Sequence, residues 1–188
     1  QNEILANLAR RFANPLFYPA AGDFYTCGFL GVDPYVNVKA ENGAVIETKL
    51  VGKYNFENIA TALCIGKYFE VDANAANQAV AEYAPENMRS QVVQKGTNTI
   101  ILDAYNANPS SMKVAIDSLA EMKTDKKVLI LGDMFELEGE SDHEHQQLGQ
   151  LILDRGFSDV YLCGKLVAKT KEVVSFANHF EKKEELIN

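Results

Sequence analysis

Hydrophobic and polar residues alternate with a period of two in the early part of the chain, in three short runs at 24–31, 34–40 and 44–50. This alternation is typical of strands that bury one face. Asn42-Gly43 lies between the second and third runs, and an Asn-Gly pair in that position is a strong hairpin signal. The pattern therefore predicts three strands, the last two joined by a turn.

The hydrophobic period lengthens to that of a helix after residue 54, and it predicts helices over 55–69 and 73–84. The predicted apolar faces consist of Ile59, Ala62, Leu63 and Gly66 in the first helix and of Ala76, Ala79, Val80 and Tyr83 in the second. The stretch APENMRS, at 84–90, then interrupts the pattern. We therefore predict two domains, at 1–85 and 86–188.

Strands and helices alternate in the second of these domains. Apolar runs at 99–104, 127–133 and 159–164 predict strands, and each is followed by a helical pattern. In the helix over 141–156, Ser141 and Glu144 have the spacing of a capping box, and Gly156 is a typical stop. The order predicts an α/β fold with a mostly parallel, doubly wound sheet of the Rossmann-like kind.

Polar residues are concentrated where two of the predicted strands end. The first segment, Asp103–Ser111, follows one strand, and the second, Gly132–Glu136, follows the next. Ligands of open parallel sheets bind beyond the carboxyl ends of the strands, so we expect both segments at one edge and predict a ligand site there. A simpler role accounts for Asn108 as a helix N-cap, for Pro109 as the first helical residue and for Asp103 as a turn cap.

Composition excludes several classes of partner. The chain has 188 residues, 47% of them hydrophobic, and a net charge of −8. This charge repels polyanions, so we expect neither a nucleic acid nor an anionic membrane as partner. Cys27, Cys64 and Cys163 are far apart and form no CxxC pair, which favours buried thiols in a reducing cytoplasm over a disulfide framework or a zinc knuckle.

Targeting signals are absent from this sequence. No apolar run is long enough to span a bilayer, and the amphipathic start QNEILANLARRF lacks the apolar core of a secretory signal. We expect a cytoplasmic monomer. Because the first residue is Gln1 and not Met, we also expect a processed product or an excised piece of a longer chain.

Two segments carry a family resemblance. DAYNANPSSMKVAIDSL, followed by VLILGDMFELEGESDHEHQQLG, resembles the C-terminal domain of the Mur ligases, within them the subgroup that adds D-alanyl-D-alanine to UDP-N-acetylmuramoyl tripeptide. Upstream, LVGKYNFENIATAL resembles the family's G-x-H-N-x-x-N helix start, with Tyr54 where His is usual. The resemblance implies the tail of a central ATP-binding α/β domain before residue 86 and a truncated acceptor domain after it.

The resemblance also implies site residues and partners. Family members use ATP and Mg²⁺ to form an acyl phosphate, which an incoming amine attacks during peptidoglycan precursor synthesis. The matching residues would bind ATP at Asn55, Asn58, Arg89 and Asp103, and the D-alanyl-D-alanine acceptor at Tyr105, Asn106, Asn108, Asp133, Glu136 and His145. No metal ligand and no catalytic residue is assigned to this chain.

Simpler roles remain open for several of these residues. Asn55 and Asn58 could serve only to begin a helix, and Arg89 could form an ordinary surface ion pair. The run His143-Glu144-His145 invites a metal interpretation, but residues two apart on a helix do not share a face.

The phosphate-binding loop of such ligases does not occur in the sequence. GKY at 52 and 66 and GKL at 164 each lack the final Ser or Thr of the G-x-x-x-x-G-K-[ST] motif. We therefore expect a fragment of an ATP-dependent amide ligase that is inactive alone, with the magnesium ligands upstream. The alternatives are a non-catalytic nucleotide- or acceptor-binding α/β module and a sister ligase of the Mur or folylpolyglutamate type.

Overall fold

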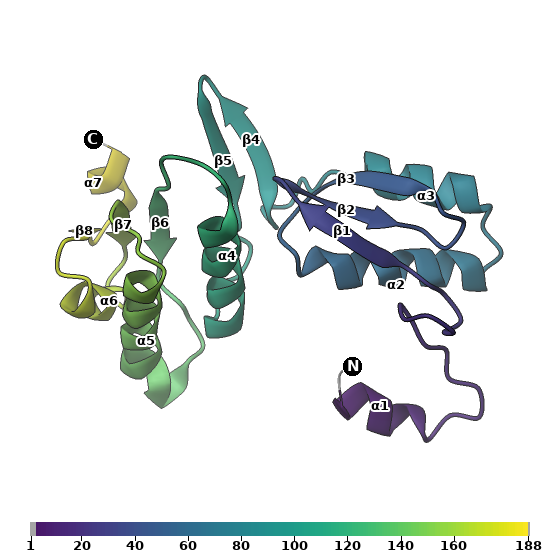
Figure 1. Ribbon diagram of the computed structural model, residues 1–188. Coiled ribbons are helices and arrows are strands. Elements are labelled where there is room, and N and C mark those ends of the chain that lie inside the picture. The colour runs from purple at the N-terminus through teal and green to yellow at the C-terminus, as the bar shows by residue number, and fades with distance from the viewer. Residues whose placement is uncertain (1–2, 188) are drawn as a thin grey trace. The chain divides into compact units, whose positions relative to one another are not determined.

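The computed structural model describes residues 3–187, which form two compact units (Figure 1). The first unit ends at Ala84 and the second begins at Pro85. Each unit has a hydrophobic core of its own. None of the helices among the described residues combines the length and the apolar character needed to cross a bilayer.

The first unit is a three-stranded antiparallel sheet with two long helices packed against it. Its elements are α1 (Glu3–Ala9), β1 (Gly28–Val32), β2 (Tyr35–Lys39), β3 (Val45–Val51), α2 (Asn55–Tyr68) and α3 (Ala73–Glu82). The strand order is β1-β2-β3. The three strands, the turn at Asn42-Gly43 and both helices are thus confirmed, with Gly43 at φ 86° where the turn needs a left-handed residue.

The core of this unit forms between α2 and one face of the sheet. Alternate residues of β2 and β3, among them Val36, Val38 and Ile46, are buried. On α2 the buried residues are Asn55, Ile59, Ala60, Leu63 and Cys64, while Ala62 is exposed. Ile59 and Leu63 of the predicted apolar face are thus confirmed as buried, whereas Ala62 and Gly66 lie beside the buried stripe, which follows the i, i+4, i+5 positions that start at Asn55.

The three cysteines form no disulfide bond. Cys27 and Cys64 are buried and Cys163 is half-buried, all three as free cysteines. Burial raises the pKa of Cys27 to about 11 and also raises the pKa of Cys64. A thiol with a raised pKa stays protonated and unreactive, so Cys27 and Cys64 act as small apolar core residues.

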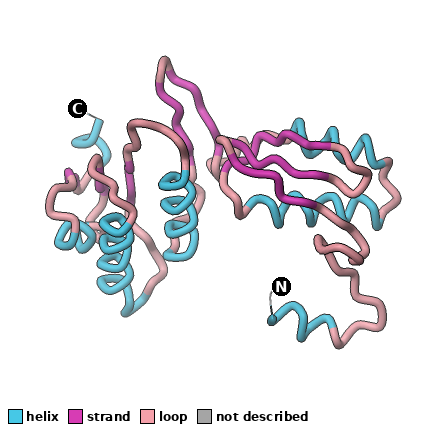
Figure 2. Tube along the Cα trace, in the orientation of Figure 1, coloured by secondary structure: helices cyan, strands magenta, loops and turns pink. Residues whose placement is uncertain are grey.

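The second unit contains a parallel sheet and a separate hairpin, both coloured as strands in Figure 2. Its elements are β4 (Gln91–Lys95), β5 (Asn98–Leu102), α4 (Pro109–Glu121), β6 (Leu129–Gly132), the 3-10 helix η1 (Glu138–Glu140), α5 (Ser141–Asp154), β7 (Val160–Cys163), α6 (Ala168–Val173), β8 (Asn178–Phe180) and α7 (Lys183–Ile187). The parallel sheet has the order β6-β7-β8. The predicted α/β fold with a parallel sheet is confirmed.

One strand of this unit pairs differently from the prediction. We expected the strand at 99–104 to lie in the parallel sheet, but β5 pairs antiparallel with β4, in register from Gln91↔Leu102 to Lys95↔Asn98. Gly96, at φ 62°, begins the tight turn between them. The local hairpin closes with a two-residue turn, whereas joining the parallel sheet requires a long crossover.

The ends of α5 also differ in part from the prediction. The capping box of Ser141 and Glu144 does not form, because η1 runs directly into α5 and makes Glu140 the N-cap, without a side-chain hydrogen bond. Gly156 is confirmed as the stop. It has φ 71° directly after the C-cap Arg155, and its N–H donates to the Leu153 carbonyl.

Candidate functional site

The corner between β5 and α4 is built around a reciprocal cap. Asn108 is the N-cap of α4, and its Oδ1 accepts the Ser111 N–H at 2.9 Å. In return the Asn108 N–H donates to Ser111 Oγ at 3.1 Å, and Pro109 occupies the first helical position. The simpler roles predicted for Asn108 and Pro109 are confirmed, so the Asn108 side chain is occupied by the helix that it starts.

Replacing Asn108 with alanine should therefore destabilise the second unit by about 1 kcal/mol, because the Ser111 N–H at the start of α4 loses its cap. Urea unfolding followed by circular dichroism measures this change. Ser110→Ala is the matched control, since the Ser110 hydroxyl only adds a further bond to Asn108 Oδ1 at 3.2 Å and should cost little. Equal stability of the Asn108→Ala variant and the unsubstituted chain would contradict the capping role.

Asp103 fastens the end of β5 to the segment that precedes β4. Its Oδ1 accepts the Ser90 N–H at 3.2 Å, and beside it the Ala104 N–H donates to the Met88 carbonyl at 2.8 Å. Met88 and Ser90 are both left-handed, at φ 57° and 51°. Asp103 thus bridges two chain segments and does not cap a turn, and its side chain remains exposed, with Oδ2 facing no donor among residues 3–187.

Arg89 and Tyr105 stack beside this bridge. The Arg89 guanidinium carbon lies 3.9 Å from the centre of the Tyr105 ring. Both residues are exposed, and Arg89 forms no ion pair with any residue in the range 3–187, so the surface ion pair considered for it is not present. Stacking fixes the plane of the guanidinium and leaves its N–H donors to solvent. Asn106, next in the chain, is also exposed.

The second polar segment begins with a carboxylate that holds a neighbouring loop. Asp133, half-buried after β6, accepts the Lys165 N–H at 3.1 Å through Oδ2 and the Val167 N–H at 2.8 Å through Oδ1. Those two residues lie between β7 and α6. Both oxygens of Asp133 are therefore engaged by the loop between β7 and α6, across the carboxyl end of the parallel sheet.

The two residues after Met134 face solvent. Phe135 is 67% exposed, and the Glu136 carboxylate has no hydrogen bond or ion pair with residues 3–187. Glu136 has φ 61°, a conformation that non-glycine residues adopt rarely and that costs on the order of 1 kcal/mol or more. Strained residues of this kind cluster at functional sites when the surrounding structure holds them in place.

His145 lies inside the protein. Its exposure is 0%, its Nε2 accepts the Met134 N–H at 3.1 Å and its Nδ1 donates to the Ser141 carbonyl at 2.7 Å. Both ring nitrogens are bonded to the main chain and the residue is fully buried, so in this structure His145 presents no free polar atom. The acceptor role that the family resemblance implied for His145 stays a prediction.

Asn55 and Asn58 lie on the first turn of α2, in the first unit. The N-cap is Tyr54, so neither asparagine caps the helix. The buried Asn55 donates to the Val51 carbonyl at 2.7 Å and accepts from Asn58 Nδ2 at 3.1 Å. The exposed Asn58 keeps its carboxamide oxygen free of partners within residues 3–187. Asn55 thus holds Asn58, and Asn58 is the one that can meet a ligand.

Both polar segments of the second unit are anchored in one core. Ala107 from the corner before α4 and Met134 from the segment after β6 belong to the same hydrophobic cluster. The sequence analysis missed Ser90, Lys165 and Val167, which contribute only main-chain N–H groups to the site. No side-chain pattern could have identified them, since main-chain donors are present at every residue except proline.

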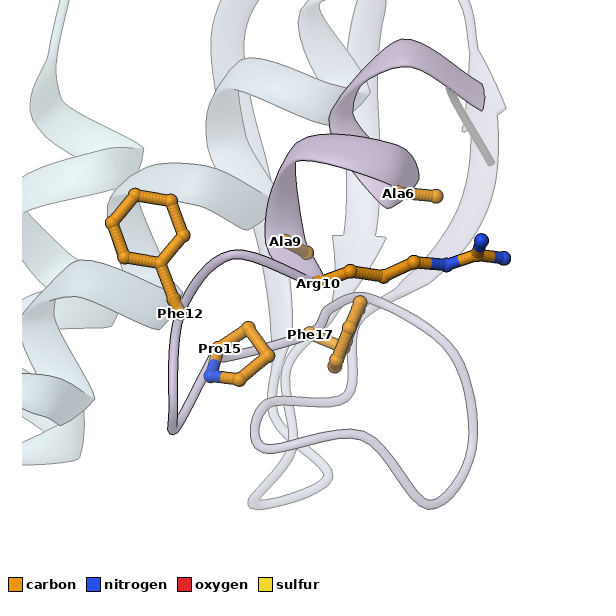
Figure 3. A pocket seen from close by; sticks show the side chains of 6 residues that line it. All are labelled: Ala6, Ala9, Arg10, Phe12, Pro15 and Phe17. Carbon is orange, nitrogen blue, oxygen red and sulfur yellow. The ribbon is translucent and has the colours of Figure 1, made fainter.

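Two other features of the described chain lack site chemistry. Within residues 3–187, no group of three or more His, Cys, Asp or Glu side chains is placed to hold a metal ion, and this includes His143 and Glu144. An open hollow of about 360 Å³ lies between α1 and the segment that follows it, and Figure 3 shows the side chains that line it. They are mostly apolar, Arg10 is their only charge, and none is a predicted site residue.

Comparison with known proteins gives concordant results. A family model described as Mur ligase, glutamate ligase domain, matches residues 88–188. The chain is 34% identical over 135 residues to the UDP-N-acetylmuramoyl-tripeptide–D-alanyl-D-alanine ligase of Bacillus subtilis, covering 71% of this chain and 29% of that protein. The corresponding ligase of Escherichia coli is 32% identical over 139 residues, covering 73% and 30%.

A solved structure shares the fold. The crystal structure of MurF ligase from Thermotoga maritima in complex with ADP superposes with a TM-score of 0.79 at 20% identity, covering 98% of this chain and 44% of that one. The aligned part of this chain spans less than a third of either relative whose sequence is compared above.

Proposed function

The chain belongs to the Mur ligase family, and we propose that it is part of an ATP-dependent ligase that joins D-alanyl-D-alanine to UDP-N-acetylmuramoyl tripeptide. The Bacillus subtilis and Escherichia coli relatives carry that name, which supports the choice within the family. The observation that carries the proposal is the pair of exposed polar segments, one after β5 and one after β6, anchored in a single core.

The nucleotide would be bound by residues that keep free polar atoms. Asp103 Oδ2 can accept hydroxyl groups of a ribose while Oδ1 holds the Ser90 N–H. The Arg89 guanidinium, held in one orientation by stacking on Tyr105, offers N–H donors to phosphate oxygens. Asn58 offers its carboxamide oxygen to the amino group of a base. In this proposal Asn55 and Tyr105 position their neighbours.

The amine acceptor would lie against the exposed part of both segments. Asn106 and Glu136 supply free polar groups there, while Asn108, Asp133 and His145 hold the backbone that carries them. Amide formation from an acyl phosphate depends mainly on placing the amine against the carbonyl carbon, and fixed backbone is what such placement requires. Bound Mg²⁺ would neutralise phosphate charge in this reaction; no group within residues 3–187 fits it.

Phosphate release from ATP tests the proposal. The longer protein of which this chain is proposed to be a part, called the full-length parent below, is assayed with UDP-N-acetylmuramoyl tripeptide and D-alanyl-D-alanine, each omitted in turn. This chain is assayed alongside. We expect release only when both substrates are present, and none from this chain alone. Release that requires a different amine would keep the family and replace the acceptor. Absence of release in every combination would favour a non-catalytic binding module.

Asp103→Ala in the parent should raise the KM for ATP roughly tenfold and leave the KM for D-alanyl-D-alanine within about twofold, because a ribose hydroxyl loses a charged acceptor. Asp103→Asn is the matched variant. It keeps an oxygen for the Ser90 N–H but loses the carboxylate, so it should show the same rise if the ribose contact matters. An equal rise in both KM values would refute this division of roles.

A further inference from the structure

The hydrogen-bond partners of His145 assign a different role to each ring nitrogen. The Ser141 carbonyl can only accept, so Nδ1 carries the hydrogen, and the Met134 N–H can only donate, so Nε2 carries the lone pair. The main chain of His145 is fixed as well, because its carbonyl accepts the hydroxyl of the fully buried Thr170 at 2.7 Å. The ring is therefore held at both of its nitrogens, and the main chain that carries it is held by Thr170.

The His145 ring holds one of the two consecutive residues, Asp133 and Met134, that are fixed by hydrogen bonds directly after β6. Asp133 is anchored through the Lys165 and Val167 N–H groups, and the next residue, Met134, is anchored through its own N–H to His145. Met134 is also 1% exposed, so its side chain lies in the core. The chain leaves this double anchor directly into Phe135 and Glu136.

The residues beyond the anchor have the properties of a recognition surface. Glu136 is left-handed at φ 61°, and its carboxylate is unpaired within residues 3–187. Phe135 presents a largely exposed ring. A carboxylate next to an apolar ring suits a small molecule that has a primary ammonium group and methyl groups on its neighbouring carbon atoms. A left-handed glutamate needs fixed backbone close by, since otherwise it would relax to a more common conformation, and the anchored Met134 lies two residues before Glu136.

We propose that His145 is a positioning residue for the amine acceptor. Through Met134 it fixes the direction in which Phe135 and Glu136 leave β6, and so it determines how well the acceptor binds without touching it. The inference rests on the proposed function for the identity of the acceptor. The part that concerns the loop rests only on the contacts within the second unit.

Two substitutions separate the two hydrogen bonds of the ring. His145→Gln places an oxygen near the position of Nε2 and can accept the Met134 N–H, whereas His145→Asn places its amide near Nδ1 and keeps only the bond to Ser141. Both introduce a buried carboxamide, so both should lower stability. In the full-length parent we expect His145→Asn to raise the KM for D-alanyl-D-alanine roughly tenfold with the KM for ATP unchanged, and His145→Gln to raise it less than about threefold.

Amide hydrogen exchange at Met134 supplies a readout that does not depend on activity. Both variants are made in the full-length parent. We expect the Met134 amide to exchange at least about tenfold faster in the His145→Asn variant than in the His145→Gln variant, since only His145→Asn removes the acceptor of this N–H. Equal exchange, or KM values that rise equally in both variants, would show that His145 acts only through stability and would overturn the inference. If the parent uses no amine at all, the proposed function fails while the exchange comparison still decides the role of His145 in the loop.

Discussion

Replacement of Gly164 by alanine is expected to destabilise the second unit by about 3 kcal/mol, which is a large part of the stability of a domain of this size. A Cβ at this position would lie 2.2 Å from Oδ1 and 2.4 Å from Cγ of Asp133. The Asp133 carboxylate cannot move aside without releasing the Lys165 and Val167 N–H groups. In addition, the φ of 136° is unfavourable for any residue with a Cβ.

Urea unfolding of the variant and of two controls would measure the separate contributions. Gly96→Ala has the same kind of backbone problem, at φ 62°, but its Cβ would meet no atom within 4 Å, so it should cost only about 1 kcal/mol. The double variant Gly164→Ala with Asp133→Ala should cost less than the sum of the two single changes, since the clash is then removed. Strict additivity would contradict the proposed clash.

Gly149→Ala is expected to destabilise the same unit by about 2 kcal/mol, although alanine normally stabilises a helix interior by about 1 kcal/mol relative to glycine. Gly149 lies in α5 where α6 crosses closely. A Cβ there would lie 2.7 Å from the Cβ of Val173 and 3.2 Å from the Thr170 carbonyl oxygen. The helices would have to separate, and the hydrogen bond from Thr170 to the His145 carbonyl crosses the same interface.

The matched control is Gly66→Ala in α2, whose Cβ would make only ordinary contacts at 3.6 Å with Ala76 and 4.0 Å with Val71. This change should leave stability equal or raise it, which thermal unfolding would detect as an unchanged or higher Tm. Adding Val173→Ala to Gly149→Ala should restore part of the lost stability. A Gly149→Ala variant as stable as the unsubstituted chain would show that α5 and α6 can move apart at no cost.

Local patterns predicted most of the elements, because each of them depends on neighbours in sequence. The Asn42-Gly43 turn, the cap at Asn108 and the stop at Gly156 are all formed by residues within five positions of one another. The strand β4 was missed although Gly96-Thr97 lies between two apolar runs. The strand at 99–104 was instead assigned to the parallel sheet, because strands and helices alternate after it, and the hairpin signal was overlooked.

The site was predicted less well, because its contacts join distant parts of the chain. The partners of Asp133 are 32 and 34 residues further along, and that of Asp103 is 13 residues earlier. Nothing in the polar run SDHEHQQ distinguishes the buried His145 from the exposed His143. Burial of His145 follows from the way α5 packs, and packing of that kind is a property of the whole unit.

The contrast between the antiparallel sheet of the first unit and the parallel sheet of the second has a consequence for the order in which the chain folds. In the first unit, β2 and β3 are joined by residues 40–44, so their pairing closes a short loop. In the second unit, β6 must wait for residues 133–159 before β7 can lie beside it. Short closures cost less entropy and occur sooner. On a ribosome, the antiparallel sheet would therefore be complete while the parallel sheet still lacks its middle strand, and the slower unit would be the one that carries most of the proposed site.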